Sequence, residues 1–410
     1  LSRLLSSQTS SKMHKRFYCR RCLNDFTNEK SLGQHDEYCR NHDAVKVQLP
    51  NPDEILQFKN FKYSMRVPFI IYADFESFIK PMDTCQPNPE NSYTTKYQKH
   101  KPSSFCYYVK CFDDEIYSQE PVVFTAESDD DDVAQKFIDS LIDTMTSIHN
   151  QFKFPKNMIY TKAEAKKYNE SSLCHICNKE FSESDDKVRD HCHLTGKFRG
   201  AAHNSCNLNY KLPKFFPVVF HNLSGYDCHL FIKKLRGENG EKIKCIPNNE
   251  ERYISFSREV IVNRFKNKEG KDVVVKRELR FIDSFRFMNA SLDVLTKNLI
   301  DEKCNECKNN NKVDSDSCEE CKRLSFEKGT ANCRILIDYS KNATDEQKWL
   351  LLRKEIYPYN YVDSVERLSE TKLPPKSAFY SKLNATDITD KDYQHAQTVW
   401  KEFNCKTLRD

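Results

Sequence analysis

Alternating apolar and polar residues predict the strands of one sheet. The first run is 67–77 (VPFIIYADFES), and the runs 105–112, 121–126, 217–220, 253–265 and 272–285 are expected to add further strands. The polar segment 81–104, rich in Pro and Asn, is expected to be irregular.

Helical spacing appears in three places between or after these strands. Residues 133–152 carry apolar positions typical of an amphipathic helix packed on the sheet, and Glu127–Asp132 supply acids at its N-terminus. Shorter helical patterns open at Asp227 and at Ser291. The chain is therefore expected to have a mixed α+β or α/β fold.

Carboxylates stand at the end of the first predicted strand. Because side chains alternate along a strand, Asp74 and Glu76 are expected to share one face. Two carboxylates on one face repel each other unless a cation lies between them, and a divalent metal is the usual partner. A strand that simply leaves the core for solvent is the alternative. Asp227 follows the apolar strand 217–220 and a turn that begins at Asn222, and it is the candidate third carboxylate.

Composition and charge permit a nucleic-acid partner without requiring one. The chain has 410 residues, 30% charged residues and a net charge of +5, with a mean hydropathy of −0.77. No apolar run is long enough to span a membrane, and none resembles a secretion signal. We expect an intracellular, nuclear protein that was cut from a longer chain, because it begins with Leu.

Cysteine spacing predicts three zinc sites. Many of the 18 cysteines form C-x2-C pairs or stand near histidines, which favours thiolates on Zn²⁺ over disulfides. The expected ligand sets are Cys19, Cys22, His35 and Cys39; Cys174, Cys177, His203 and Cys206; and Cys304, Cys307, Cys318 and Cys321. His42 is an alternative to Cys39 in the first set. The third set has no neighbouring Asp-His pair and is expected to be structural.

Two motifs carry a resemblance to a known family. YADFES at 72–77 and N-x3-Tyr-Asp at 222–227 resemble the first and second exonuclease motifs of family B DNA polymerases. From SRLLSSQ at the start to YPYNYVDSVERL at 357–368, the chain resembles the protein-primed, viral and organellar type, which includes the polymerases of Polinton (Maverick) transposons.

This resemblance implies a fold and a set of site residues. The fold would be a ribonuclease H-like 3′-5′ exonuclease domain, in which Asp74, Glu76 and Asp227 bind Mg²⁺ or Mn²⁺. Asn222, Tyr226 and Phe75 would contact DNA, and a terminal protein primer would be a further partner. Asp283 also ends an apolar strand, but no family motif assigns it to the metal site.

Exonucleases of this family complete their site with a Tyr-x3-Asp motif. Tyr359 and Asp363 have this spacing, but they lie in a Pro-broken loop that the resemblance places upstream of the true motif. The sequence stops at FNCKTLRD, and the polymerase palm is not in it. We therefore expect these residues to be unable to synthesise DNA and to have at most weak exonuclease activity.

A second resemblance concerns VRDHCHLTGKFRG at 188–200, between the two halves of the second ligand set. The arrangement resembles the recombination endonuclease VII group of His-Me finger nucleases, with His203 in place of a cysteine. It implies that His191 is the general base, that Asp190 and Asn207 hold Mg²⁺, and that His193 supports the site or the leaving group. Nearby cations would bind phosphates: Lys197, Arg199 and Lys211. A structural zinc module without nuclease activity is the alternative.

These assignments divide the chain into consecutive segments. They are a linker remnant at 1–15, a zinc finger at 16–45, the exonuclease domain at 53–159 and 216–300, the inserted ββα-metal module at 160–215, a four-cysteine module at 301–335 and a helical segment at 336–410. Two other functions stay open, a non-catalytic zinc-dependent nucleic-acid-binding adaptor and an inert transposon-derived remnant. The carboxylates favour the enzyme, since an adaptor does not need them.

Overall fold

The computed structural model describes residues 16–22, 24–42, 51, 60–82, 98–184, 186–236, 242–247, 253–309, 318–331, 340–351, 356–382 and 385–410. The predicted linker 1–15 lies outside these ranges. The chain divides into two compact units, Leu1–Lys59 and Asn60–Asp410.

The first unit contains a small ββα arrangement. A short hairpin of β1 (Phe17–Tyr18) and β2 (Asp25–Phe26) precedes helix α2 (Glu29–Cys39). Asn28 caps this helix, because its side-chain oxygen accepts a hydrogen bond of 2.8 Å from the backbone N–H of Ser31. The residues after the first C-x2-C pair therefore fold as the finger spacing predicts.

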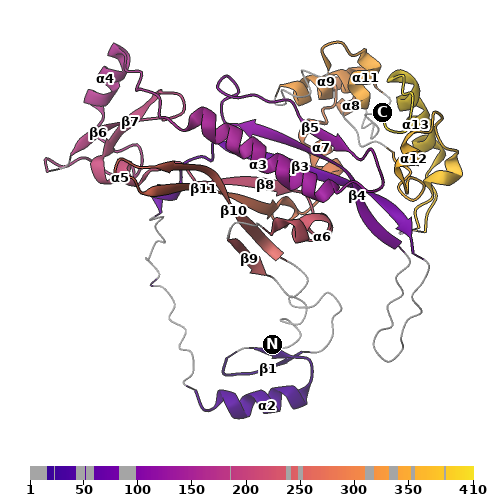
Figure 1. Ribbon diagram of the computed structural model, residues 1–410, viewed down its shortest axis with the longest axis horizontal. Helices are drawn as coiled ribbons and strands as arrows, with labels where there is room; N and C mark the ends of the chain where they lie inside the picture. Colours follow the sequence, from indigo (N-terminus) through magenta and orange to yellow (C-terminus); the bar gives the residue numbers. More distant parts are fainter. Residues whose placement is uncertain are drawn as a thin grey trace. The chain divides into compact units, whose positions relative to one another are not determined.

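The second unit is built on a mixed sheet that has seven strands within the described residues (Figure 1). Their order is β5 (Val122–Thr125), β4 (Gln98–Cys111), β3 (Phe69–Pro81), β8 (Phe215–Phe220), β11 (Asp272–Asp283), β10 (Tyr253–Lys266) and β9 (Ile243–Pro247). The pairs β3–β8 and β8–β11 are parallel, and the remaining pairs are antiparallel. Each strand run predicted from alternation therefore lies in this sheet.

One predicted boundary in the sheet is wrong. Residues 98–104 were expected to be irregular, yet they belong to β4 and continue its antiparallel ladder with β3 down to the pair Pro81 and Gln98. Backbone pairing overrides the local polar composition there, because ladder hydrogen bonds do not depend on apolar side chains. The turn between β10 and β11 is as predicted, with Gly270 at φ 76°.

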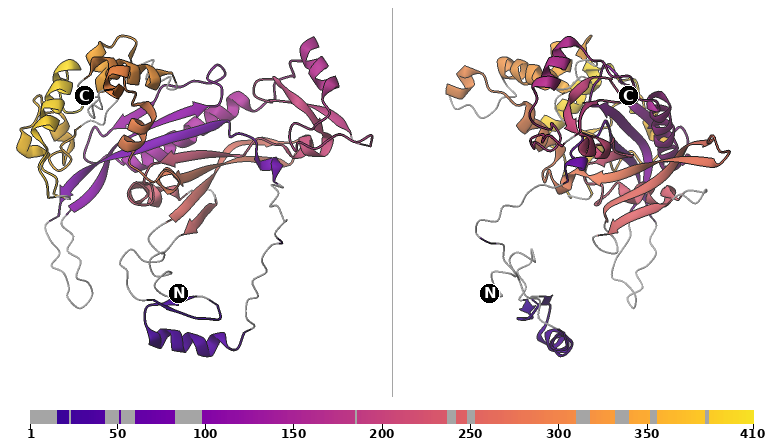
Figure 2. Two further views of the ribbon diagram at one scale, coloured as in Figure 1. Left: turned by 180° about the vertical axis from the view of Figure 1, so that it is seen from behind. Right: turned by 90° about the vertical axis from the view of Figure 1, so that its left-hand side faces the viewer.

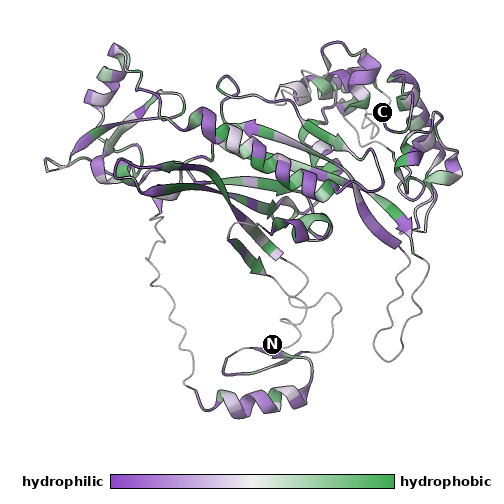
Figure 3. Ribbon diagram, in the orientation of Figure 1, coloured by the Kyte–Doolittle hydropathy of each residue, from purple (hydrophilic) through white to green (hydrophobic). Residues whose placement is uncertain are grey.

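Helix α3 (Val133–Phe152) covers one face of the sheet and follows the predicted bounds. It lies in front of the strands in Figure 1 and behind them in the left view of Figure 2. Asp132 caps it, with its side chain accepting from the N–H of Gln135 at 3.1 Å. Its apolar residues pack into a core rich in aromatic rings, and Figure 3 shows apolar and polar residues alternating along the helix.

The remaining helices and strands of the second unit lie outside this sheet. Before and within the inserted segment lie η1 (Phe61–Tyr63), α4 (Lys162–Glu170), β6 (Lys187–His191), β7 (Phe198–His203) and α5 (Asn204–Asn209). After β8 come α6 (Cys228–Phe231), η2 (Ile232–Leu235), η3 (Ser284–Arg286), α7 (Leu292–Ile300), α8 (Asn305–Asn309), α9 (Glu319–Thr330), α11 (Asp345–Leu350), α12 (Val365–Leu368), η5 (Lys376–Phe379) and α13 (Asp390–Glu402). Among the described helices, none combines the length and apolarity needed to cross a bilayer.

Candidate functional site

Three parallel strands deliver acidic residues to one edge of the sheet. Strands β3, β8 and β11 run in the same direction, with Tyr72 beside Val219 and Asp283 beside Phe220. The carboxyl ends of parallel strands meet at one edge. Asp74 lies just beyond Tyr72, and the loop that carries Asp227 leaves the end of β8.

Asp227 is buried among like charges. Its residue is 3% exposed, whereas Asp74 and Glu76 are exposed. Burial, followed by the charges of Asp74 and Glu76, raises the pKa of Asp227 to about 8. These three side chains therefore interact electrostatically as one acidic group, which we call the carboxylate cluster, and an added cation would relieve its repulsion. They are not among the groups in the described part of the chain whose ligand atoms all lie within 4.8 Å of one another.

Asp283 holds the loop that carries Asp227. Its carboxylate accepts from the backbone N–H groups of Asn222, Ser224 and Phe285, each at 3.0 Å, and from the Ser224 hydroxyl at 2.7 Å. Burial opposes ionisation, but the bonds from Ser224 and its neighbours outweigh it and lower the pKa of Asp283. Because these donors occupy its oxygens, Asp283 is a loop anchor, a role that no sequence motif indicated.

The turn at the start of this loop has little steric freedom. Asn222 has φ 71°, in the left-handed region that asparagine tolerates better than most residues. A Cβ on Gly225 would lie 2.3 Å from the Asn222 Oδ1 atom, so a larger residue there would force the Asn222 side chain to move. Asn222 is thus explained by the turn that it forms.

Tyrosines and a histidine border the carboxylate cluster. The Tyr226 hydroxyl lies 2.5 Å from the Ser77 hydroxyl and 2.7 Å from Nδ1 of His100. The sequence context argues against Tyr359 as part of the third exonuclease motif. Tyr359 nevertheless lies near the cluster, because burial and the charges of Glu76 and Asp74 raise its pKa to about 12. The candidate partner Asp363 instead has an oxygen 3.9 Å from Nε of Arg367.

The burial of Phe75 contradicts the prediction that this residue contacts DNA. The residue is 4% exposed and its ring packs against core rings, among them Phe137 at 4.8 Å and Phe231 at 5.6 Å between centroids. Asp74 and Glu76 face out of the strand, so the alternation that exposes them turns Phe75 inward. It fills the core beneath the carboxylates.

All three predicted sulfur-rich ligand sets converge. Within each set the ligand atoms lie within 4.8 Å of one another: Cys19, Cys22, His35 and Cys39; Cys174, Cys177, His203 and Cys206; Cys304, Cys307, Cys318 and Cys321. Two Sγ pairs, Cys19–Cys39 and Cys304–Cys318, are 3.9 Å apart. Tetrahedral Zn²⁺ with bonds of about 2.3 Å places sulfurs about 3.8 Å apart, so the sets fit structural zinc.

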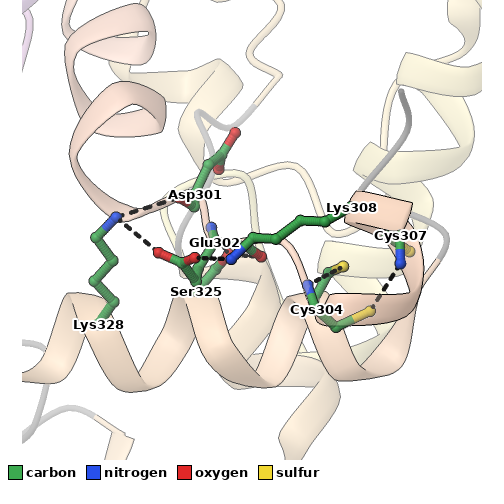
Figure 4. A network of polar contacts seen from close by, with 8 residues as sticks. Asp301, Glu302, Cys304, Cys307, Lys308, Ser325 and Lys328 are labelled. Carbon is green, nitrogen blue, oxygen red and sulfur yellow. Dashed lines mark hydrogen bonds and ion pairs between the residues drawn. The ribbon is translucent and has the colours of Figure 1, made fainter. Parts of the chain in front are cut away.

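Hydrogen bonds order the four-cysteine set (Figure 4). The N–H of Cys304 donates to Sγ of Cys321 at 3.3 Å, and the N–H of Cys307 donates to Sγ of Cys304 at 3.4 Å. Such donors stabilise thiolates. Alongside, Glu302 accepts from Lys308 at 2.8 Å and from Lys328 at 3.3 Å, which connects α8 to α9.

The second ligand set lies within a separate ββα unit. Nδ1 of His203 faces Sγ of Cys177 at 3.5 Å and Sγ of Cys206 at 3.8 Å, while Nε2 lies 3.3 Å from the carbonyl oxygen of Glu180. A carbonyl that accepts from the far nitrogen orients a histidine ligand. His203 can therefore replace a cysteine without loss of the tetrad.

Two histidines emerge at the end of the hairpin in this unit. His191 ends β6, beside a register shift between Asp190 and His191, and its ring centroid lies 5.0 Å from that of His193. Burial, followed by the charges of His191 and Arg199, lowers the pKa of His193. A neutral imidazole near neutral pH can accept a proton from water.

The hairpin turn that presents these histidines depends on Gly196. This glycine has φ 79°, and a Cβ on it would lie 2.5 Å from the Asn157 carbonyl oxygen. The preceding segment packs there, with the N–H of Lys156 donating to the His193 carbonyl at 2.8 Å. The histidine pair is thus braced by residues that precede the zinc ligands.

Residues 152–220 match the family model of recombination endonuclease VII. This stretch is an endonuclease VII-like nuclease domain, which implies that it cleaves DNA. No curated protein and no solved structure matches the chain significantly. The resemblance to family B polymerases has no counterpart among these comparisons and stays a prediction.

The predicted phosphate-binding cations of the endonuclease VII-like domain have different environments. Lys197 and Lys211 are exposed, and Nζ of Lys197 lies 3.6 Å from an Asp113 oxygen. Asn207, the predicted Mg²⁺ ligand on α5, is partly exposed. Arg199 instead packs over the Tyr210 ring, 5.1 Å from its centroid, and faces Asp190.

Asp190 is the most enclosed polar residue of this domain's hairpin. It is 2% exposed, and its oxygens accept from Nη2 of Arg199 at 2.9 Å and from Nε2 of His175 at 2.9 Å. Burial opposes its ionisation, but the bonds from His175 and Arg199 outweigh burial and lower the pKa of Asp190. Sequence reasoning missed His175, although it stands directly after the zinc ligand Cys174.

Proposed function

We propose that the endonuclease VII-like domain hydrolyses DNA phosphodiester bonds with His191 as the general base. The observation that supports it most directly is the His191–His193 pair at the end of the zinc-ordered hairpin, within the segment that matches the nuclease family. His191 takes a proton from water, the water oxygen attacks phosphorus, and the bond to the leaving oxygen breaks. His193, whose ring centroid lies 5.0 Å from that of His191, would support the leaving group.

A divalent cation would stabilise the negative charge that develops on phosphorus. Of the two ligands that the family resemblance implies, Asn207 is partly exposed and offers an amide oxygen, which suits Mg²⁺ or Mn²⁺. Asp190 does not fit as an open ligand, because Arg199 and His175 already engage its oxygens. Lys197 and Lys211 are exposed and would contact backbone phosphates.

Cleavage of closed circular DNA that carries an extruded cruciform tests this function. Such DNA has no ends, so only an endonuclease can open it. We expect His191→Ala to lower the rate by about 10² to 10⁴, and a matched loss of an exposed imidazole, His229→Ala on α6, to leave it unchanged. Equal cleavage by the wild type and His191→Ala would leave the domain as a structural zinc module or DNA-binding adaptor.

We also propose a second hydrolytic function, removal of 3′-terminal nucleotides at the carboxylate cluster. Its support is the shared field of Asp74, Glu76 and Asp227 at one edge of the seven-stranded mixed sheet. One or two Mg²⁺ or Mn²⁺ ions bound between the three carboxylates would draw them together and would activate water. This is the proofreading chemistry of a polymerase used in transposon or viral replication; synthesis itself is not proposed for this chain.

Linear DNA with a labelled 3′ end tests the second function. We expect slow release of single nucleotides that Asp74→Ala abolishes and that His191→Ala leaves intact. The two substrates thus separate the two sites. A chain that binds linear DNA but releases no nucleotide under these conditions would have only the endonuclease, or neither activity.

A further inference from the structure

We infer that Asp190 is a positioning residue that links the catalytic hairpin to the zinc site through Arg199 and His175, and that it is not an open ligand for a divalent cation. The inference rests on the proposed endonuclease function. It assigns to Arg199 and His175 a role that neither the family match nor the sequence motifs give them.

Both oxygens of the Asp190 carboxylate already have a partner, and one partner is a fixed positive charge. Oδ2 lies 2.8 Å from Nε of Arg199 and 2.9 Å from Nε2 of His175, and Oδ1 accepts from Nη2 of Arg199 at 2.9 Å. Two of the about four acceptor positions of the carboxylate are therefore used by hydrogen bonds, and the Arg199 Nε atom adds an ion-pair contact at the same oxygen as His175. A divalent ion at a remaining position would lie directly beside the guanidinium, and the two positive charges would repel each other.

Arg199 is itself fixed and is not a loose surface cation. Its guanidinium lies over the Tyr210 ring, and Nη1 is 3.7 Å from Sδ of Met65. The His175 ring meets Tyr210 edge-on, with centroids 6.0 Å apart. The Asp190–Arg199 pair therefore lies between the hairpin, the residue after α5 and the segment before β3, where a packed guanidinium fixes geometry better than a hydrated ion does.

His175 connects this pair to zinc. It lies between the predicted ligands Cys174 and Cys177, and its backbone N–H donates to the Ala201 carbonyl of β7 at 2.9 Å. A Cβ on Gly200 would lie 2.8 Å from Cβ of His175, so the close approach of the two segments requires glycine. Zinc binding at the C-x2-C pair therefore fixes His175, and His175 fixes the residue next to His191.

Mn²⁺ alone is the probe for the test, followed by electron paramagnetic resonance. The full-length chain carries Asp74→Ala and Asp227→Ala so that the carboxylate cluster adds no Mn²⁺ signal. Into it we introduce Asp190→Asn, Arg199→Gln and both together. Thermal unfolding and the kinetics of cruciform cleavage are measured on the same set.

We expect the two single substitutions to act in the same direction. Each lowers kcat by about tenfold, the double variant is no worse than either, and Asp190→Asn leaves KM for DNA within about twofold, because all three break one link. The affinity for Mn²⁺ then changes by the same factor in the two single variants. Opposite changes, with Asp190→Asn losing Mn²⁺ and Arg199→Gln gaining it, would show a carboxylate that serves as a ligand and overturn the inference.

Two other outcomes also overturn it. Additive losses would mean that Asp190 and Arg199 act independently, and unchanged kcat in both variants would mean that the link has no effect on His191. Should Asp190→Asn fail to fold, Arg199→Gln alone decides, since tighter Mn²⁺ binding by that variant contradicts the inference. The Mn²⁺ and unfolding measurements need no cleavage, so they stay interpretable even if His191→Ala shows that the domain is not a nuclease.

Discussion

Two aspartates of this chain are buried to nearly the same extent and have opposite pKa shifts. Asp190 is 2% exposed and Asp227 is 3% exposed. The pKa of Asp190 is lowered by the bonds from His175 and Arg199, whereas burial and the charges of Asp74 and Glu76 raise the pKa of Asp227 to about 8. Burial alone therefore does not decide the charge of a carboxyl group; its partners do.

The difference separates two ways of building a nucleolytic site. In the endonuclease VII-like domain the acid next to His191 already has a cationic partner within the chain. In the carboxylate cluster the charges of Asp74 and Glu76 raise the pKa of Asp227, and the loop anchored by Asp283 holds Asp227 there. The first arrangement stabilises the fold directly, and the second stores repulsion that a bound cation can relieve.

Zinc removal should have the largest effect and should act on the regions around the three ligand sets and not on the sheet. Structural zinc contributes on the order of 10 kcal/mol that is realised on folding. We expect a strong chelator to accelerate amide hydrogen exchange throughout 172–210 and around the other two ligand sets, while β3 and β8 stay protected. Metal analysis should return three zinc ions per chain; fewer than two, or uniform unfolding of the sheet with the zinc domain, would remove the distinction between the regions.

Loss of the Asp190 carboxylate comes next. We expect Asp190→Asn to lower the free energy of unfolding by about 3 to 5 kcal/mol, because it leaves Arg199 without its charged partner. Chemical denaturation at neutral pH measures it. Asp227→Asn is the matched control and should be neutral or stabilising, since it removes a carboxylate that its neighbours repel. A similar loss from both variants would mean that burial, and not the partner, governs these sites.

The pH dependence of stability should then differ in sign. The pKa of Asp227 is above its ordinary value, so the folded chain binds more protons than the unfolded chain between about pH 4 and 8. The contribution of Asp227 to the free energy of unfolding is fully present at low pH. It is lost as pH rises toward 8, and the loss is about 2 to 3 kcal/mol once the surroundings of the charged group have relaxed. Asp190 acts oppositely, because its stabilisation is lost as pH falls below about 4.

Thermal unfolding from pH 5 to 9, with and without Mn²⁺, measures the Asp227 part. Mn²⁺ should raise the melting temperature more at pH 9 than at pH 6, because the ion binds the ionised cluster. Asp227→Asn should flatten the pH profile. An unchanged profile in that variant would place the titration elsewhere.

The smallest expected effect concerns the border of the carboxylate cluster. Tyr226→Phe removes the hydroxyl that contacts Ser77 and His100, and should cost about 1 kcal/mol. Urea titration measures it, with Tyr63→Phe, an exposed tyrosine of the same unit, as the control. A loss no larger than that of the control would show that these contacts do not hold the loop.

The sequence determined local features well. Cysteine spacing predicted all three ligand sets, because zinc requires four close ligands and each C-x2-C pair supplies two from one turn. Helix α3 follows from apolar spacing and an acidic cap, and the strands follow from alternation, because these signals are carried by neighbouring residues. The face shared by Asp74 and Glu76 is fixed in the same way, by a period of two residues.

Only the tertiary structure decided which charges meet. His175 and Arg199 are 24 residues apart in the chain, yet both contact Asp190. Asp283, at the end of β11, anchors the loop that follows β8 and contains Asn222. Neither contact has a local pattern, because each arises where parallel strands or a zinc-ordered turn bring distant backbone together. The inward position of Phe75 was readable from alternation, but the charge of Asp190 and of Asp227 was not, since a pKa depends on the field of groups that only folding assembles.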